Sequence, residues 1–157
     1  MVAKNQPDQI DPWVQRYVNK LKSMTGLSNW NIIVSPKPAD PGSLGETEVV
    51  YGQNLAKMYL HKDFRKDSPE EIRDTIVHEL MHCHMEPMIE IMSDVLKPEP
   101  DDPKSKAVHK AAMAVLAYES ERIVDAISES LGKWLPTPDM PKPRKVTKTR
   151  AKKTAKR

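Results

Sequence analysis

SPEEIRDTIVHELMH, residues 68–82, is the stretch that decides the fold of this chain, because it specifies a helix and also the chemistry that the helix carries. It starts with a residue that can cap a helix, Ser68, followed by a proline at the first helical position. Glu71, three residues after Ser68, completes a capping box. The sequence therefore predicts a helix that begins at Ser68 and that ends or kinks at Pro87.

The second half of this stretch places three reactive side chains on the predicted helix. His78 and His82 lie four residues apart, which puts them about 40° apart around the helix axis and one turn from each other. Both imidazoles can therefore reach one zinc ion at about 2.0–2.1 Å. Glu79 lies between them on the same side, where its carboxylate can take a proton from a water on the metal. We predict one Zn²⁺ bound by His78 and His82, with Glu79 as general base.

The rest of the chain predicts a small sheet between helices. Trp13, Tyr17 and Leu21 recur at helical spacing after Pro12, and Gly26 can end that helix in the left-handed conformation. Strands are expected at Trp30–Ser35, Glu48–Tyr51 and Ala56–His61, and a last helix at Asp102–Gly132. This order predicts an α+β fold with an N-terminal helix, a small mixed sheet of two to four strands, a metal helix and a C-terminal helix that carries a glutamate ligand.

Composition predicts one ordered domain without a membrane span. The 157 residues are enough for a single core, and no run of 18 apolar residues is present. The N-terminal residues are polar and carry no signal segment, and a single cysteine, Cys83, fits a reducing compartment. We therefore expect a cytoplasmic protein. Its predicted parts are a polar arm over 1–10, a domain over 11–135, and a Pro-rich, then basic disordered tail over 136–157.

Charge is divided unevenly between the body and the tail. Nine of the 25 Lys and Arg lie in residues 141–157, which contain no acid, so residues 1–140 hold 16 bases against all 22 acids, a net charge of −6. A basic run of this kind attracts phosphates without reading sequence. The tail is predicted either to bind nucleic acid non-specifically, or to act as a solubilising segment or as a partner of the acidic body.

A catalytic zinc site needs a third protein ligand besides the two histidines. The candidates are His61, His84, His109, Glu119 and Glu121. His84 lies about 200° around the helix from His82, so it cannot bind the same ion. His61 is predicted on the outward face of its strand, where we expect an ordinary surface histidine.

Glu121 is the favoured third ligand, because its lane on the last helix also holds a second carboxylate. Asp125 lies one turn further along, where it can accept a hydrogen bond from the distal nitrogen of a zinc-bound histidine and orient that ring. Ala114 and Ala117 in the same lane would let this helix approach its neighbour closely. Glu119 instead has an arginine three residues on, which favours a surface ion pair.

The HELMH motif followed by Glu121-x-x-x-Asp125 resembles the pattern of the gluzincins, zinc metallopeptidases with HExxH on one helix and ExxxD on a later one. Residues 26–34, GLSNWNIIV, are similar to the G-L-x-x-W-x-I-x-V segment of small zincin-like metallopeptidases of phages and prophages. The resemblance covers roughly residues 11–132. His84 departs from it, because zincins usually carry an apolar residue at that place.

The resemblance implies a minimal zincin fold and a zinc metallopeptidase that hydrolyses peptide bonds, in the host cytoplasm if the protein is phage-encoded. The substrate would be a peptide or protein, and we expect it to pair with the strand Ala56–Leu60 by strand addition. Gluzincins add a His or Tyr that donates to the oxyanion. Tyr118 is the candidate for this catalytic role here, with His109 as the alternative.

Two other functions stay open. SprT-like zinc proteases, which are DNA-associated, take a histidine roughly twenty residues past HExxH as third ligand, and His109 lies 27 residues past His82. The second is a non-catalytic zinc-binding protein associated with nucleic acid. Structural zinc sites are usually closed by four ligands, often cysteines. Cys83 is predicted to point off the metal face, which favours an open, catalytic site.

Overall fold

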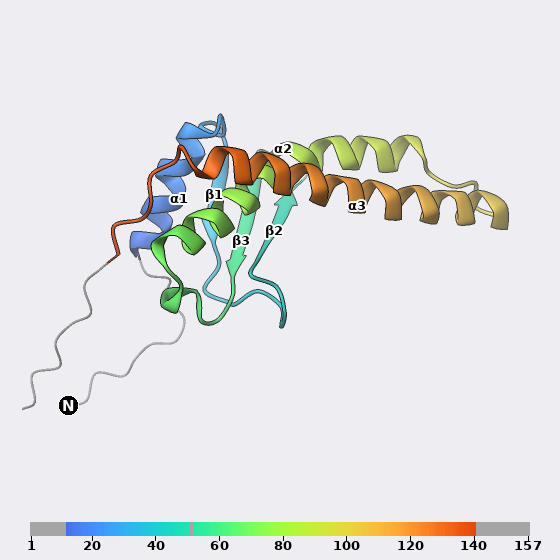
Figure 1. Ribbon diagram of the computed structural model, residues 1–157. Helices are drawn as coiled ribbons and strands as arrows, with labels where there is room; N and C mark the ends of the chain where they lie inside the picture. The colour runs from blue at the N-terminus through green and yellow to red at the C-terminus, as the bar shows by residue number, and fades with distance from the viewer. Residues whose placement is uncertain (1–11, 51, 141–157) are drawn as a thin grey trace, which may run out of the picture.

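A computed structural model describes residues 12–50 and 52–140 (Figure 1). Its elements in chain order are α1 (Pro12–Met24), β1 (Asn31–Val34), β2 (Gly45–Val50), β3 (Leu55–Leu60), the 3-10 turn η1 (Phe64–Lys66), α2 (Pro69–Val95) and α3 (Pro103–Gly132). The predicted α+β class is confirmed, with three strands in the described part of the chain. None of the helices described is long and apolar enough to cross a membrane. The predicted arm over 1–10 and the basic run over 141–157 lie outside the described residues.

The strands form one mixed sheet in the order β1-β3-β2. β1 runs parallel to β3, with Val34 opposite Met58, and β2 runs antiparallel to β3, with Thr47 opposite the same Met58. Ala56, Met58 and Leu60 are buried at alternate positions of β3, as expected for a strand with one face on the core. The alternating apolar residues in this stretch of sequence therefore belong to the central strand of the sheet.

This topology corrects the expected place of a substrate. Strand addition to Ala56–Leu60 is wrong, because β3 has a hydrogen-bonded neighbour on each side and offers no unpaired backbone. Among the described strands, β1 and β2 are the edge strands, and β2 is the one against which α2 chiefly packs.

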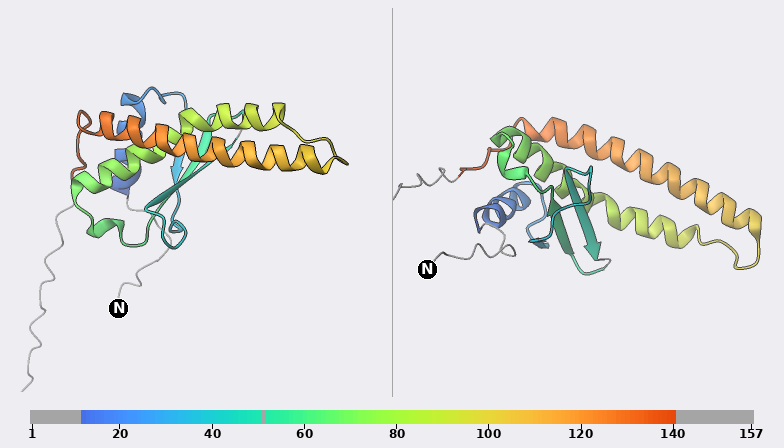
Figure 2. Two further views of the ribbon diagram at one scale, coloured as in Figure 1. Left: turned by 45° about the vertical axis from the view of Figure 1, so that its right-hand side comes forward. Right: turned by 90° about the horizontal axis from the view of Figure 1, so that it is seen from below.

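Helix α2 lies between the sheet and α3 (Figure 2). It begins as predicted: the Ser68 hydroxyl accepts a hydrogen bond from the Glu71 amide at 3.2 Å, and the Glu71 carboxylate accepts one from the Ser68 amide at 2.7 Å. Ile72, Ile76 and Leu80 on its inner face are buried in the core that α1 and the sheet also form. The cap and this inner face fix both the start of α2 and its rotation about its own axis.

We predicted that this helix ends or kinks at Pro87; the end is wrong, because α2 continues through Pro87 to Val95. A proline inside a helix removes one backbone hydrogen bond, and α2 nevertheless continues for about two further turns. Beyond Pro87, Met92 of α2 lines an apolar groove with Val108 and Val115 of α3. The two helices thus form a long hairpin whose far half extends past the sheet (Figures 1 and 2).

The chain after α3 returns to α1. The Tyr17 hydroxyl donates to the Pro136 carbonyl at 2.7 Å, and Leu135 and Met140 pack against the core. Burial raises the pKa of Tyr17, so the hydroxyl keeps the proton that it donates. Residues 136–140, which lie beyond the predicted domain boundary at 135, therefore contact the domain.

Candidate metal centre

Three predicted ligands converge where α2 faces α3. Nε2 of His78 lies 3.2 Å from Nε2 of His82, and the Glu121 carboxylate oxygens lie 3.5 Å from the first nitrogen and 3.7 Å from the second. This is the one group of three potential ligands found within residues 12–50 and 52–140. The two helices therefore bring together the two histidines and the third ligand that sequence reasoning favoured.

The spacing of these atoms fits zinc. Ligands at tetrahedral angles and about 2.0–2.1 Å from one ion stand roughly 3.3 Å from each other, close to the three separations between His78, His82 and Glu121. Two histidines and one carboxylate are also a donor set that zinc takes in catalytic sites, where the fourth position is left for water. The residues present therefore fit a catalytic zinc ion.

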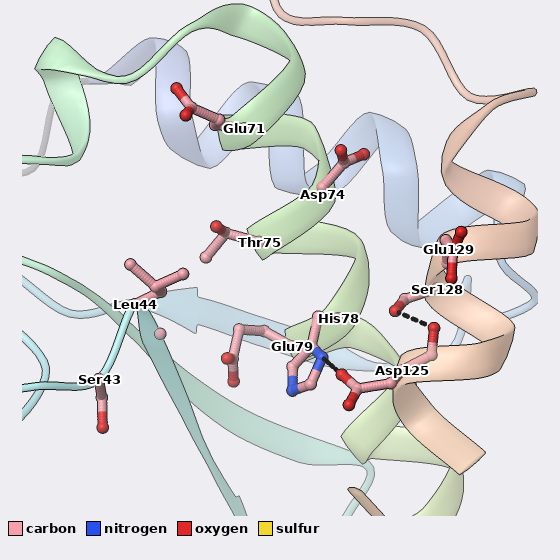
Figure 3. Close-up of a pocket in the computed structure, with 11 residues that line it drawn as sticks. Ser43, Leu44, Glu71, Asp74, Thr75, His78, Glu79, Asp125, Ser128 and Glu129 are labelled. Atoms are coloured by element: carbon pink, nitrogen blue, oxygen red, sulfur yellow. Dashed lines mark hydrogen bonds and ion pairs between the residues drawn. The ribbon is translucent and has the colours of Figure 1, made fainter. Parts of the chain in front are cut away.

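Asp125 lies beside one ring nitrogen of His78, and the other ring nitrogen faces the remaining candidate ligands. The Asp125 carboxylate oxygen lies 3.2 Å from Nδ1 of His78 (Figure 3), and a carboxylate at this place favours the tautomer that carries its proton on Nδ1. The lone pair of His78 then lies on Nε2, which faces the other two ligands. The contact is the one that the predicted supporting role of Asp125 requires, since such partners orient a ligating ring and raise its basicity; the role itself stays a prediction.

His82 is the more buried of the two histidines, with a side chain 12% exposed against 26% for His78. Its pKa is lowered because burial disfavours the charged imidazolium, although the nearby Glu121 carboxylate acts in the opposite direction. A neutral ring is the form that binds a metal ion. Burial therefore holds His82 in the state that a ligand needs.

Glu79 is buried beside the ligands and faces the sheet. The residue is 3% exposed, and its Oε2 accepts a hydrogen bond from the Thr47 hydroxyl on β2 at 2.8 Å. Burial raises the pKa of Glu79 to about 7, and the Thr47 hydrogen bond lowers it in part. A carboxylate whose pKa lies near neutral pH can both accept a proton and give it back. The predicted general base thus has suitable electrostatics.

Helix α3 reaches α2 along a lane of small residues. The buried positions of α3 are Ser120, Val124, Ser128 and Gly132, spaced four residues apart. The expectation that Ala114 and Ala117 provide the close approach is wrong, because both alanines are exposed. Glu121 and Asp125 each follow a member of the buried lane by one residue, so their carboxylates emerge at its edge, beside α2.

A cleft of about 700 Å³ opens next to the ligands, between β2, the first half of α2 and the end of α3 (Figure 3). Its lining residues are Ser43, Leu44, Gly45, Glu71, Asp74, Thr75, His78, Glu79, Asp125, Ser128 and Glu129. Five of these carry carboxylates and none is lysine or arginine. The cleft is large enough for several residues of an extended peptide, and its own charge is negative.

Tyr118, the predicted oxyanion donor, does not line this cleft. Its side chain is 64% exposed, and the guanidinium of Arg122 lies 5.9 Å from the centre of its ring. The structure thus leaves the role of Tyr118 as a prediction.

The competing third ligands lie elsewhere. His109 is twelve residues before Glu121 on the same helix, about 18 Å along its axis, and its Nδ1 donates to the Leu96 carbonyl at 2.8 Å. Glu119 forms an ion pair with Arg122 at 3.0 Å, as its spacing indicated. Neither belongs to the group of converging ligands.

The remaining histidines and the cysteine are also held away from the ligands. His61 pairs with Asp67 at 2.5 Å, and Nε2 of His84 lies 2.8 Å from the Thr25 carbonyl at the end of α1. Cys83 is 1% exposed, and burial raises the pKa of its thiol to about 12. The thiol therefore stays protonated and is no zinc ligand at neutral pH.

Sequence reasoning missed two residues of the site, Thr47 and Gly45 on β2. Both contact Glu79, the first through its hydroxyl and the second through its lack of a side chain. The sequence shows only that Gly45, Thr47 and Val49 alternate along a short segment. Such an alternation does not indicate that two of these residues contact Glu79 on a different element.

Comparison of the chain with protein-family models, with curated proteins and with solved structures finds no match. The sequence motifs and the geometry of His78, Glu79, His82 and Glu121 therefore carry the functional argument by themselves.

Proposed function

We propose that this protein is a zinc-dependent peptidase with His78, His82 and Glu121 as ligands. The observation that carries the proposal is the convergence of these side chains: the two Nε2 atoms lie 3.2 Å apart, and the Glu121 carboxylate places one oxygen 3.5 Å from His78 and the other 3.7 Å from His82, which suits one ion. The buried carboxylate of Glu79 and the open cleft beside it add what hydrolysis needs, a base and room for a substrate. The resemblance of these motifs to those of small gluzincins supports the same function.

Each residue has a defined part in this proposal. Bound zinc would supply Lewis-acid chemistry, lowering the pKa of a water to about 7 and polarising the scissile carbonyl. Asp125 holds the proton on Nδ1 of His78 and so keeps Nε2 free to ligate. Glu79 takes the proton of the attacking water and passes it to the leaving amine, for which a pKa of about 7 is well matched.

The substrate would bind in extended form against β2, the edge strand against which α2 chiefly packs. Strand addition uses the main-chain groups of an edge strand, so it needs little from the substrate sequence. Gly45 and Leu44 at the start of β2 line the cleft beside Glu79, so a peptide paired with β2 passes close to the ligands. The cleft and the strand edge therefore define one path for the chain to be cleaved.

The test combines metal analysis with a peptide-library digest of the full chain. Wild type should bind one zinc and cleave. Glu79→Gln should keep the zinc and lose cleavage by roughly 100-fold or more, as expected when a general base is removed. Glu90→Gln, an exposed position further along the same helix, is the matched control and should match wild type. Full activity of Glu79→Gln, or no zinc in the wild type, would contradict the proposal.

A further inference from the structure

We infer that strand β2, through Thr47 and Gly45, positions the Glu79 carboxylate, with Thr47 as a positioning residue for the general base. The inference rests on the proposed function and adds to it a component outside the metal-binding helices. Neither residue belongs to the ligand set or to the HExxH motif.

Thr47 holds one oxygen of the carboxylate. Its hydroxyl donates to Oε2 of Glu79 at 2.8 Å, across 32 residues of sequence and between a strand and a helix. The hydroxyl proton can make this bond only to one carboxylate oxygen at a time. Oε2 is therefore fixed towards the strand, and Oε1 keeps its lone pairs for a proton from the attacking water.

Gly45 leaves room for the other oxygen. A Cβ at this position would lie 2.6 Å from Oε1 and 2.8 Å from both Cδ and Cγ of Glu79. These distances are well below van der Waals contact, so any side chain here would displace the carboxylate. Gly45 is not among the residues with positive φ. The close approach of Glu79, and not the backbone conformation, is therefore what calls for glycine.

The two contacts come from one face of one strand. Gly45 and Thr47 are two residues apart on β2, so they point to the same side of the sheet, and both meet Glu79. The buried carboxylate is thereby held between the Thr47 hydroxyl and the Gly45 backbone. Since the substrate path also follows β2, one strand would set the relative position of the base and the scissile bond, which is what orientation in catalysis requires.

A pair of substitutions at Thr47 separates positioning from a structural role. Thr47→Val keeps the shape and removes the donor, and Thr47→Ser keeps the donor. We expect Thr47→Val to lower kcat at least tenfold while KM stays within about twofold of wild type. Thr47→Ser should stay within about threefold of wild type in both. Equal loss in both variants, or a Thr47→Val enzyme with wild-type kcat, would overturn the inference.

A spectroscopic readout accompanies the kinetics. Co²⁺ replaces zinc in the purified protein, and its visible absorption reports on the ligands and on the water in the open position. Thr47→Val should bind one Co²⁺ with wild-type affinity and show an altered spectrum, because the carboxylate beside the open position has moved. Thr47→Ser should restore the wild-type spectrum. An unchanged Thr47→Val spectrum would count against the inference.

Gly45→Ala gives the second, steric arm of the test. It should lower kcat at least as much as Thr47→Val, with one Co²⁺ still bound. If Gly45→Ala does not fold, the comparison of Thr47→Val with Thr47→Ser tests the inference by itself. The results that contradict the proposed function and the role of β2 are distinct. A wild type that binds no Co²⁺ or cleaves nothing overturns the proposed function, whereas an active wild type with an equally active Thr47→Val overturns only the role of β2.

Discussion

The two helices that form the metal centre hold their residues by different means. On α2, Glu79 is 3% exposed and the His82 side chain 12%, and the sheet, the core and the helix cap all constrain them. On α3, the side chains of Glu121 and Asp125 are 56% and 71% exposed. The α2 side is therefore built by folding itself, whereas the α3 side depends on helix packing and on what it binds.

The difference in side-chain exposure indicates which helix should change more when a metal ion binds. Exposed carboxylates on α3 gain little from surface ion pairs, so under the proposed function their order would come chiefly from the bound ion. The buried groups of α2 are fixed already, and carry the desolvation cost of that burial. Substitutions on α3 should therefore act on metal affinity, and substitutions on α2 should act on stability or on the chemical step.

The largest effect is expected from Glu121→Ala, which removes the only α3 ligand. Loss of a direct ligand should raise the Kd for zinc by more than about 100-fold, beyond the 10–100-fold typical of an outer partner. Competition with a zinc-sensitive dye gives the Kd. Glu119→Ala, two residues earlier and paired with Arg122, is the control. Similar affinities for the two variants would sink the assignment of the third ligand.

The next effect concerns the buried base on α2. The pKa of Glu79 rises from 4.5 to about 7 on folding, through burial. The folded protein thus holds a proton that the unfolded chain releases, so this stabilisation is complete below pH 4.5 and is lost as the pH rises through 7. Relative to Glu79→Gln, metal-free wild type should lose roughly 2–3 kcal/mol between pH 4.5 and pH 8.

Urea unfolding of both metal-free proteins across this pH range measures the difference. Because the Gln side chain cannot titrate, the other ionisable groups cancel in the comparison. If the difference in unfolding free energy between the two proteins stays constant with pH, Glu79 is solvated in the folded protein. The α2 side of the site would then be no more buried than the α3 side.

A smaller effect is expected from Asp125→Asn on the α3 side. The amide can still accept from Nδ1 of His78, but without the negative charge that makes the imidazole a better ligand. The Kd for zinc should rise about 10- to 100-fold, with the folded stability of the metal-free protein unchanged. Isothermal titration calorimetry with zinc measures this, and an unchanged Kd would mean that the contact at 3.2 Å does not support the ligand.

The smallest effect is expected from Ser68→Ala at the cap of α2. The substitution removes the hydroxyl that accepts from the Glu71 amide and should destabilise the protein by about 1 kcal/mol. Thermal unfolding measures this loss. Zinc affinity should not change, since the cap lies ten residues before His78. A loss of affinity without a loss of stability would contradict the division between the two helices.

The sequence predicted the α2 side of the site better than anything else, for a physical reason. The cap, the helix and the placement of His78, Glu79 and His82 all depend on residues that lie close together within one helix, so local rules apply. Glu121 and Asp125 were found through their spacing on a second helix, but whether they reach α2 depends on the small-residue lane at Ser120, Val124, Ser128 and Gly132, which the alanines at 114 and 117 obscured.

The sequence predicted the presence of the sheet, but the strand that we expected to pair with the substrate was the wrong one. Three strands were predicted, but β2 begins at Gly45 and not at the predicted Glu48. The order β1-β3-β2 is a long-range property, and it places the strand expected to bind substrate in the middle. The contact of Thr47 with Glu79 has the same origin, because strand position and helix rotation must both be known first. Pro87 shows the opposite case, in which the helix continues past a strong local signal for its end.

The burial of Cys83 has a practical consequence. It is the only cysteine among 157 residues, and at 1% exposure with a protonated thiol it is closed to alkylating reagents while α2 stays packed. Labelling can therefore occur only when the metal helix opens. The natural sequence thus contains its own reporter, and the rate of maleimide addition, with and without zinc, would read out how firmly the ion locks the helix that carries two of its ligands.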